Sequence, residues 1–298
     1  MPGTIPKPLE PILREFADVA GYLWDLGWAE ASAGNISADV TSLIKVPLSR
    51  GRAGQDLPMP LPAIAGRRFL VTATGSRFRD FHNAPEDNVC LVEVSNDGDR
   101  ISWNSLVFSA RGLNPTSELP SHLEIHAILR QQGSSSRAIL HTHPTHLATI
   151  SHLRRCADPD ELNRLLWMTH PEAKIFAPRG ATLVPYLLPG SNELGAATAR
   201  AVRGGADTIL WRYHGCIAHA PDPSTALDRI HVLDKASNMV LMCLASGEPW
   251  EGLDAAELGA LRQVRDEVSV LDAGCWMLDA GWEHRTIART FQPTDHAD

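Results

Sequence analysis

The stretch AILHTHPTHL, residues 138–147, is the most informative part of the sequence for the fold and for a possible metal site. An apolar run typical of a buried strand ends in two histidines separated by one residue. Residues i and i+2 of a strand point to the same face, so His141 and His143 are expected to lie side by side. Zinc needs three or four such ligands, and a catalytic site keeps one position open. The alternative is an ordinary pair of hydrogen-bonded strand histidines.

A third ligand would favour the metal site. The other candidates are His146, His152, His170, His214 and His219. His214 follows the apolar run ILWRY and precedes a glycine, so a neighbouring strand could deliver it to the same place. Placement favours His214, although spacing alone leaves the other four open.

Two further histidines, His122 and His126, are one helical turn apart. The residues between them are LEI, so no glutamate follows the first histidine directly as it does in the HExxH zinc-protease motif. We interpret both as ordinary helix residues.

Composition excludes several classes of function. The chain has 298 residues, is 44% apolar and 21% charged, and carries a net charge of −8 with scattered basic residues. This balance indicates no nucleic-acid or membrane partner, since both require a concentrated positive face. The motifs GxGxxG, GxxxxGK[ST] and GxSxG are absent. The N-terminus has no signal-peptide pattern, and the five cysteines are widely spaced without a CxxC pair, so we expect reduced thiols and a cytoplasmic location.

Strand and helix signals mix without strict alternation. They predict a single α/β domain over residues 1–298 with a mixed or largely antiparallel sheet. Helices are expected at 9–27, from Pro120 to Gly133 with a capping box of Ser121 and Glu124, and near 157–169, 192–203, 224–246 and 255–279. Strands are expected at 67–76, in a hairpin over 88–104, and at 136–143, 173–186 and 207–220, while 46–66 is predicted to be a loop.

Five short motifs occur in one order along the chain. They are GNIS (34–37), TATGS (72–76), PTSELP (115–120), HTHP (141–144) and YHG (213–215). In this order they resemble the class II aldolase/adducin family, and within it the branch that cleaves L-rhamnulose 1-phosphate. The resemblance implies a three-layer α/β/α sandwich with a largely antiparallel central sheet, assembled as a homotetramer with sites at subunit contacts.

The resemblance also implies roles for individual residues. His141, His143 and His214 would bind zinc, one ion per subunit, and Glu118 would be the catalytic acid/base. Glu172 would be a second catalytic carboxylate, presented to a neighbouring subunit. The residues matching the substrate-phosphate site are Ser32, Asn35, Thr74, Gly75, Thr116 and Ser117. Without the resemblance, Glu118 would be read as a carboxylate at a helix N-terminus and the small polar residues as turns.

The implied reaction is reversible cleavage of L-rhamnulose 1-phosphate, or a similar ketose 1-phosphate, to dihydroxyacetone phosphate and L-lactaldehyde. Another sugar-phosphate lyase, epimerase or dehydratase of the superfamily is the alternative. A non-catalytic adducin-like interaction module is a third, disfavoured because all three histidines and Glu118 are present. One departure concerns the substrate: the branch has Asn-Gly-Gly-Asn where this chain has Ser32-Ala33-Gly34-Asn35, so Ala33 adds a methyl group.

Overall fold

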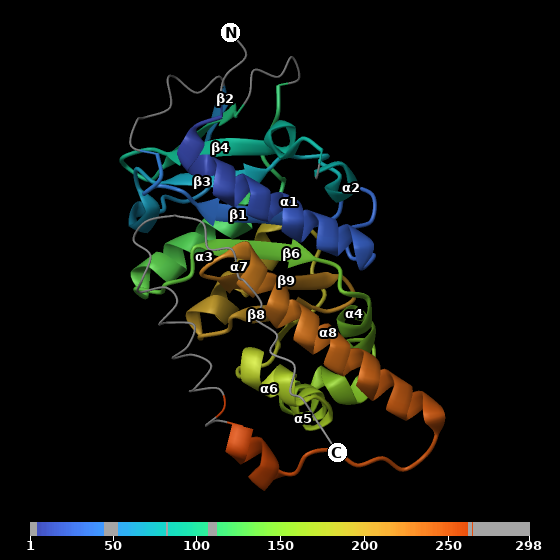
Figure 1. Cartoon of the computed structure of the whole chain (residues 1–298). Coiled ribbons are helices and arrows are strands. Elements are labelled where there is room, and N and C mark those ends of the chain that lie inside the picture. The colour runs from blue at the N-terminus through green and yellow to red at the C-terminus, as the bar shows by residue number, and fades with distance from the viewer. Residues whose placement is uncertain (1–4, 45–52, 82, 107–111, 262–263, 265–298) are drawn as a thin grey trace, which may run out of the picture.

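A single nine-stranded sheet forms the centre of the molecule (Figure 1). The computed structural model describes residues 5–44, 53–81, 83–106, 112–261 and 264. The strands are β1 (Asn35–Asp39), β2 (Ala53–Asp56), β3 (Arg68–Thr72), β4 (Val89–Val94), β5 (Arg100–Ser105), β6 (Ala138–Thr142), β7 (Thr182–Val184), β8 (Thr208–Trp211) and β9 (Gly215–Ala220). Their order is β2-β5-β4-β3-β1-β6-β9-β8-β7, and only β7 and β8 pair in parallel.

Helices cover both faces of the sheet. The α-helices are α1 (Glu10–Asp25), α2 (Phe78–Phe81), α3 (Leu119–Gln131), α4 (Thr145–Ile150), α5 (Pro159–Thr169), α6 (Pro171–Phe176), α7 (Asn192–Arg203) and α8 (Pro223–Ser246). Short 3-10 helices are η1 (Lys7–Leu9), η2 (Pro62–Ile64), η3 (Pro85–Asn88) and η4 (Arg154–Ala157). One core joins α1, α2, α4, α5, α6 and α8 to one face, and α3 and α7 pack on the other. The expected α/β/α sandwich with a largely antiparallel sheet is confirmed.

Strand β1 shows how the sequence selects the two faces. Ile36 and Ala38 enter the core shared with α1 and α8, whereas the alternate residues Asn35 and Ser37 turn toward α3. The period of two residues follows from the pleat of a strand. On the neighbouring strand β6, Ile139 faces α3 and α7. His141 is two residues further along the strand and is therefore on the same face. Polar residues of β1 and β6 therefore reach one region, beside the start of α3.

Several predicted elements differ from the structure. Residues 173–186, predicted as one strand, begin inside α6, because Pro171 starts a helix whose Ala173 packs in the core, and only Thr182–Val184 is a strand. Residues 207–220 form two strands joined by a tight turn. The loop 46–66 contains β2, which pairs with β5. Helix α3 begins at Leu119, with Pro120 in its first turn as expected. Its N-cap is Glu118, so the capping box of Ser121 and Glu124 is wrong.

The C-terminal part of the chain is described only in part. Residues 255–261 are helical, and most of the predicted helix 255–279 lies outside the described residues, as does Cys275. Among the described residues, no helix is both long enough and apolar enough to cross a bilayer.

Candidate active site

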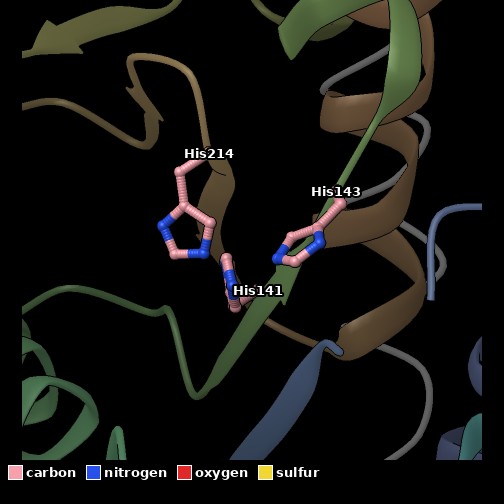
Figure 2. Close-up of side chains that lie close together, drawn as sticks. All are labelled: His141, His143 and His214. Carbon is pink, nitrogen blue, oxygen red and sulfur yellow. The ribbon is translucent and has the colours of Figure 1, made fainter. Parts of the chain in front are cut away.

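Three imidazoles point toward one another (Figure 2). His141 comes from β6, His143 from the residue just beyond the end of β6, and His214 from the turn between β8 and β9. Their candidate ligand atoms all lie within 4.8 Å of one another, and this is a group that could hold a metal ion. The structure thus brings together the HxH pair and the favoured third histidine.

Hydrogen bonds orient two of the rings. Nδ1 of His141 donates to the carbonyl of Cys216 at 3.0 Å, and Nδ1 of His143 donates to Oε1 of Glu30 at 2.7 Å. Each bond leaves Nε2 without a proton and free to bind a cation. Nδ1 of His214 is buried without a hydrogen-bond partner in the described part of the chain. These three rings form a donor set of imidazole nitrogens that fits a metal ion.

The protonation of the rings suits a metal. Burial lowers the pKa of His141, with the Glu118 carboxylate opposing the shift, and burial together with the other two histidines lowers the pKa of His214 to about 4. Both imidazoles are therefore neutral at physiological pH, which is the form that donates a lone pair.

The turn that carries His214 explains the motif YHG. A Cβ atom on Gly215 would lie 2.7 Å from the Thr142 carbonyl and 2.8 Å from Cδ2 of His143, so only glycine allows β9 to approach the histidines. Tyr213 has φ 66°, a conformation that costs free energy for a residue with a side chain and that clusters at functional sites. The Tyr213 backbone N–H donates to Oγ of Ser151, which helps to hold this turn.

Trp211 supports the cluster from beneath. Its ring lies 4.6 Å from that of His141 and 5.2 Å from that of His214, and it is 2% exposed. The indole Nε1–H donates to Oγ1 of Thr198 on α7. The apolar strand ILW therefore ends in Trp211, whose ring packs against two of the three histidines.

Glu118 lies beside this cluster. It is the N-cap residue of α3, and that position alone would suggest that its side chain caps the helix. The side chain makes no capping hydrogen bond. Oε2 lies 3.9 Å from Nε2 of His141 and accepts a 2.9 Å hydrogen bond from Nδ2 of Asn35. Burial works to raise the pKa of Glu118, but the histidines and the Asn35 hydrogen bond outweigh it and lower the pKa. The group is a carboxylate at neutral pH.

Of the residues that match a phosphate site, Thr74, Gly75 and Thr116 lie on adjacent segments, and Asn35 lies beside Glu118. The segments of Thr74 and Thr116 run side by side, since Ala73 and Pro115 form a bridge and the Thr116 N–H donates to the carbonyl of Thr72. Thr74 and Gly75 line a cavity of about 710 Å³, which Asp80 and Asp87 also line. Ser117 and Ser32 are exposed, whereas Asn35 is buried against Glu118.

The remaining candidates have other partners. Glu172, at the start of α6, is half exposed and lies 3.0 Å from Nδ1 of His170. No ion pair or hydrogen bond within the described residues joins Glu172 to the three histidines. His146 binds Asp234, His152 packs against the ring of Tyr213, and Nε2 of His219 donates to the carbonyl of Ala206.

Sequence reasoning missed three residues around the cluster. Glu30 orients His143, Trp211 packs under two rings, and Asp234 accepts from the backbone N–H groups of His146 and Leu147 at the start of α4, directly after the HTHP motif. Glu30 and Asp234 lie 113 and 88 residues from their partners, so no local pattern signals the contacts.

Comparison with known proteins agrees with this geometry. Residues 14–241 match the family described as Class II Aldolase and Adducin N-terminal domain. The chain is 32% identical over 249 residues to a rhamnulose-1-phosphate aldolase of Bacteroides thetaiotaomicron, covering 83% of this chain and 91% of that protein. It is 33% identical over 234 residues to a rhamnulose-1-phosphate aldolase of Listeria welshimeri, covering 78% and 83%.

A solved structure gives the same result. The crystal structure of a sugar-phosphate aldolase from Thermotoga maritima superposes with a TM-score of 0.68 at 33% identity, covering 82% of this chain and 99% of that one. The chain therefore belongs to the class II aldolase and adducin family, as an aldehyde-lyase.

Proposed function

We propose that this aldolase cleaves L-rhamnulose 1-phosphate, or a ketose 1-phosphate of similar structure, to dihydroxyacetone phosphate and L-lactaldehyde. The observation that carries the proposal is the position of the Glu118 carboxylate, 3.9 Å from one of three converging imidazoles. The substrate is inferred from the relatives that are named rhamnulose-1-phosphate aldolases and share about a third of their residues with this chain.

The ion we propose is zinc, one per subunit, held by His141, His143 and His214. Three neutral imidazole nitrogens with further positions left open are a donor set typical of catalytic zinc. Bound there, zinc would supply Lewis acidity for the negative charge that develops as the carbon–carbon bond breaks.

Glu118 supplies the base. Its carboxylate accepts the proton of the hydroxyl on carbon 4, the bond between carbons 3 and 4 breaks, and carbon 4 leaves as the aldehyde. The protonated Glu118 then gives its proton to the former carbon 3 of the three-carbon fragment, which becomes dihydroxyacetone phosphate, and Glu118 is ionised again. Glu118 is suited to this role because it is ionised and its side chain is only 13% exposed, so few waters compete for the proton.

The substrate phosphate is proposed to bind among Ser32, Asn35, Thr74, Gly75, Thr116 and Ser117. Hydroxyl groups and backbone N–H groups of small residues bind a dianion without arginine. Asp80 and Asp87 would repel a dianion, so we place the phosphate on the Thr74–Gly75 side of the cavity that they share.

Glu172 is proposed to act in the site of a neighbouring subunit of a homotetramer. Its half-exposed carboxylate, which pairs with His170 within the described residues, supports that role. We further propose that the domain spans 1–298 and works in the cytoplasm, which the free, buried thiols of Cys90, Cys156 and Cys216 support.

The test is release of dihydroxyacetone phosphate from L-rhamnulose 1-phosphate, followed with a coupled reductase, with and without a chelator. Rapid release that chelation abolishes and zinc restores would support the proposal. No release from folded, zinc-loaded protein would contradict the substrate assignment.

A further inference from the structure

A chain of buried polar side chains runs from Glu118 along the contact between β1 and α3. Asn35 and Ser37 of β1 face His122 and His126, which are one turn apart on α3. All four are 6% exposed or less. Oδ1 of Asn35 lies 2.5 Å from Nε2 of His122, Nδ1 of His122 lies 2.7 Å from Oγ of Ser37, and that Oγ lies 2.9 Å from Nε2 of His126.

The direction of every hydrogen bond in this row of buried side chains follows from the bond between Asn35 and Glu118. Asn35 donates through Nδ2 to the Glu118 carboxylate, so its carbonyl oxygen faces His122. A carbonyl only accepts, and His122 must therefore carry its proton on Nε2. Nδ1 of His122 then accepts from the Ser37 hydroxyl, whose oxygen accepts from Nε2 of His126. One arrangement satisfies all four groups.

Burial supports the same tautomer. It lowers the pKa of His122 to about 4, with Glu118 opposing the shift, so the ring is neutral and has a single proton to place. The rest of this helix face packs with apolar residues such as Leu119 and Leu123, and an apolar residue at 122 would avoid burying a polar ring.

We propose that His122 is a positioning residue for Glu118, acting through Asn35. Its Nε2–H holds the Asn35 carbonyl and so keeps the Asn35 amide group turned toward the carboxylate. Without that donor the buried Asn35 carbonyl has lost its partner, and the amide can rotate, which weakens its hydrogen bond to Glu118 and loosens the carboxylate from its place beside His141. The inference rests on the proposed role of Glu118 as the base.

Two substitutions at one position test it. Glutamine places an N–H where the imidazole has Nε2, and the shorter asparagine reaches only as far as Nδ1. H122Q therefore keeps a donor for Asn35, whereas H122N leaves Asn35 without one. We expect kcat of H122Q to stay within about threefold of wild type, and kcat of H122N to fall by about tenfold or more with KM little changed, as part of the roughly 10²–10⁴-fold effect of a general base.

His126 provides the matched control. It is on the same helix, is as deeply buried and contacts Ser37, but it does not touch Asn35. H126Q and H126N should both keep kcat within about threefold of wild type, because they perturb the packing without changing the donor to Asn35. A second readout needs no turnover: the side-chain amide ¹⁵N–¹H resonances of Asn35 in metal-free protein should keep their shifts in H122Q.

The outcomes separate this inference from the proposed function. Wild-type kcat in H122N, or equal losses in all four variants, would contradict the positioning role. If H122N does not fold, the result for H122Q still tests the inference. Loss of the Asn35 side-chain amide resonance in H122Q, or a tenfold loss of its kcat, would overturn it. Failure of the proposed function would be seen elsewhere, as no cleavage by wild type or full turnover by E118Q.

Discussion

Nδ1 of His143 donates a 2.7 Å hydrogen bond to Oε1 of Glu30, five residues beyond the end of α1. A carboxylate behind a ligating imidazole fixes the tautomer and makes the other nitrogen a better donor. Partial burial works to raise the pKa of Glu30, but the bond to His143, a hydrogen bond from the Glu30 backbone and the nearby histidines together outweigh it and lower the pKa, so the acceptor stays charged at neutral pH.

Replacing Glu30 should therefore weaken metal binding. We expect E30A to bind zinc about 10–100-fold more weakly than wild type, measured by competition with a chromogenic chelator. E161A is the control, because Glu161 is a surface carboxylate paired with Arg164. Equal zinc affinity in E30A and E161A would show that the His143–Glu30 bond does not support the site.

Gly215 should not tolerate a side chain. In G215A the new Cβ would meet the carbonyl of Thr142 and the ring of His143, both closer than 3.0 Å, so we expect lost zinc binding and roughly 1–3 kcal/mol lower stability. G21A is the matched control: Gly21 is inside α1 with no atom near its would-be Cβ, and alanine there should be neutral or stabilising. Zinc affinity and urea denaturation report on both, and a G215A protein that binds zinc normally would refute the steric argument.

Asp234 joins α8 to the segment that follows the HTHP motif. It accepts hydrogen bonds of 2.8 Å from the backbone N–H groups of His146 and Leu147 and from Nδ1 of His146, and its side chain is 5% exposed. D234A would leave buried donors unpaired at the start of α4. We expect a loss of roughly 2–4 kcal/mol in the free energy of unfolding, against little change in D228A on an exposed part of the same helix. Urea denaturation of both variants checks this.

The buried histidines make stability depend on pH. Burial lowers the pKa of His126 to about 3, while the unfolded value is near 6.5, so between these values the unfolded chain binds a proton that the native ring does not. This contribution to stability is complete above pH 6.5 and is lost as the pH falls toward 3. H126Q, which cannot be protonated, should reduce the slope of unfolding free energy against pH by on the order of 1 kcal/mol per pH unit between pH 4 and 6. Parallel slopes for metal-free H126Q and wild type would contradict a neutral buried ring.

Much of the fold could be predicted from local patterns. The helix 192–203 and the hairpin around Asn96–Arg100 were predictable because amphipathic spacing and turn residues operate within a few positions. The strand prediction over 173–186 failed because Ile175 and Phe176 resemble strand residues, while Pro171 and the packing of Ala173 in the core favour a helix. Short apolar runs do not distinguish the two.

The part of the site that could be predicted is the part whose geometry follows from the spacing of adjacent residues. In His141-Thr142-His143 the spacing puts two rings together, even though β6 ends at Thr142 and His143 lies one residue beyond it. The polar contacts around Glu118 were not predictable. His122 and Asn35 are 87 residues apart, and only the pairing of β1 with β6 and the packing of α3 bring them into contact. Read alone, His122 and His126 gave no sign of their buried hydrogen bonds.

The most direct measurement is turnover of L-rhamnulose 1-phosphate by zinc-loaded E118Q, with zinc content determined on the same sample. Glutamine keeps the size of the side chain and removes the proton acceptor, so we predict a loss of kcat of about 10²–10⁴-fold with zinc still bound. E124Q, which makes the same change elsewhere on α3, should turn over like wild type. Full turnover in E118Q, at wild-type zinc content, would contradict the assignment of Glu118 as the base.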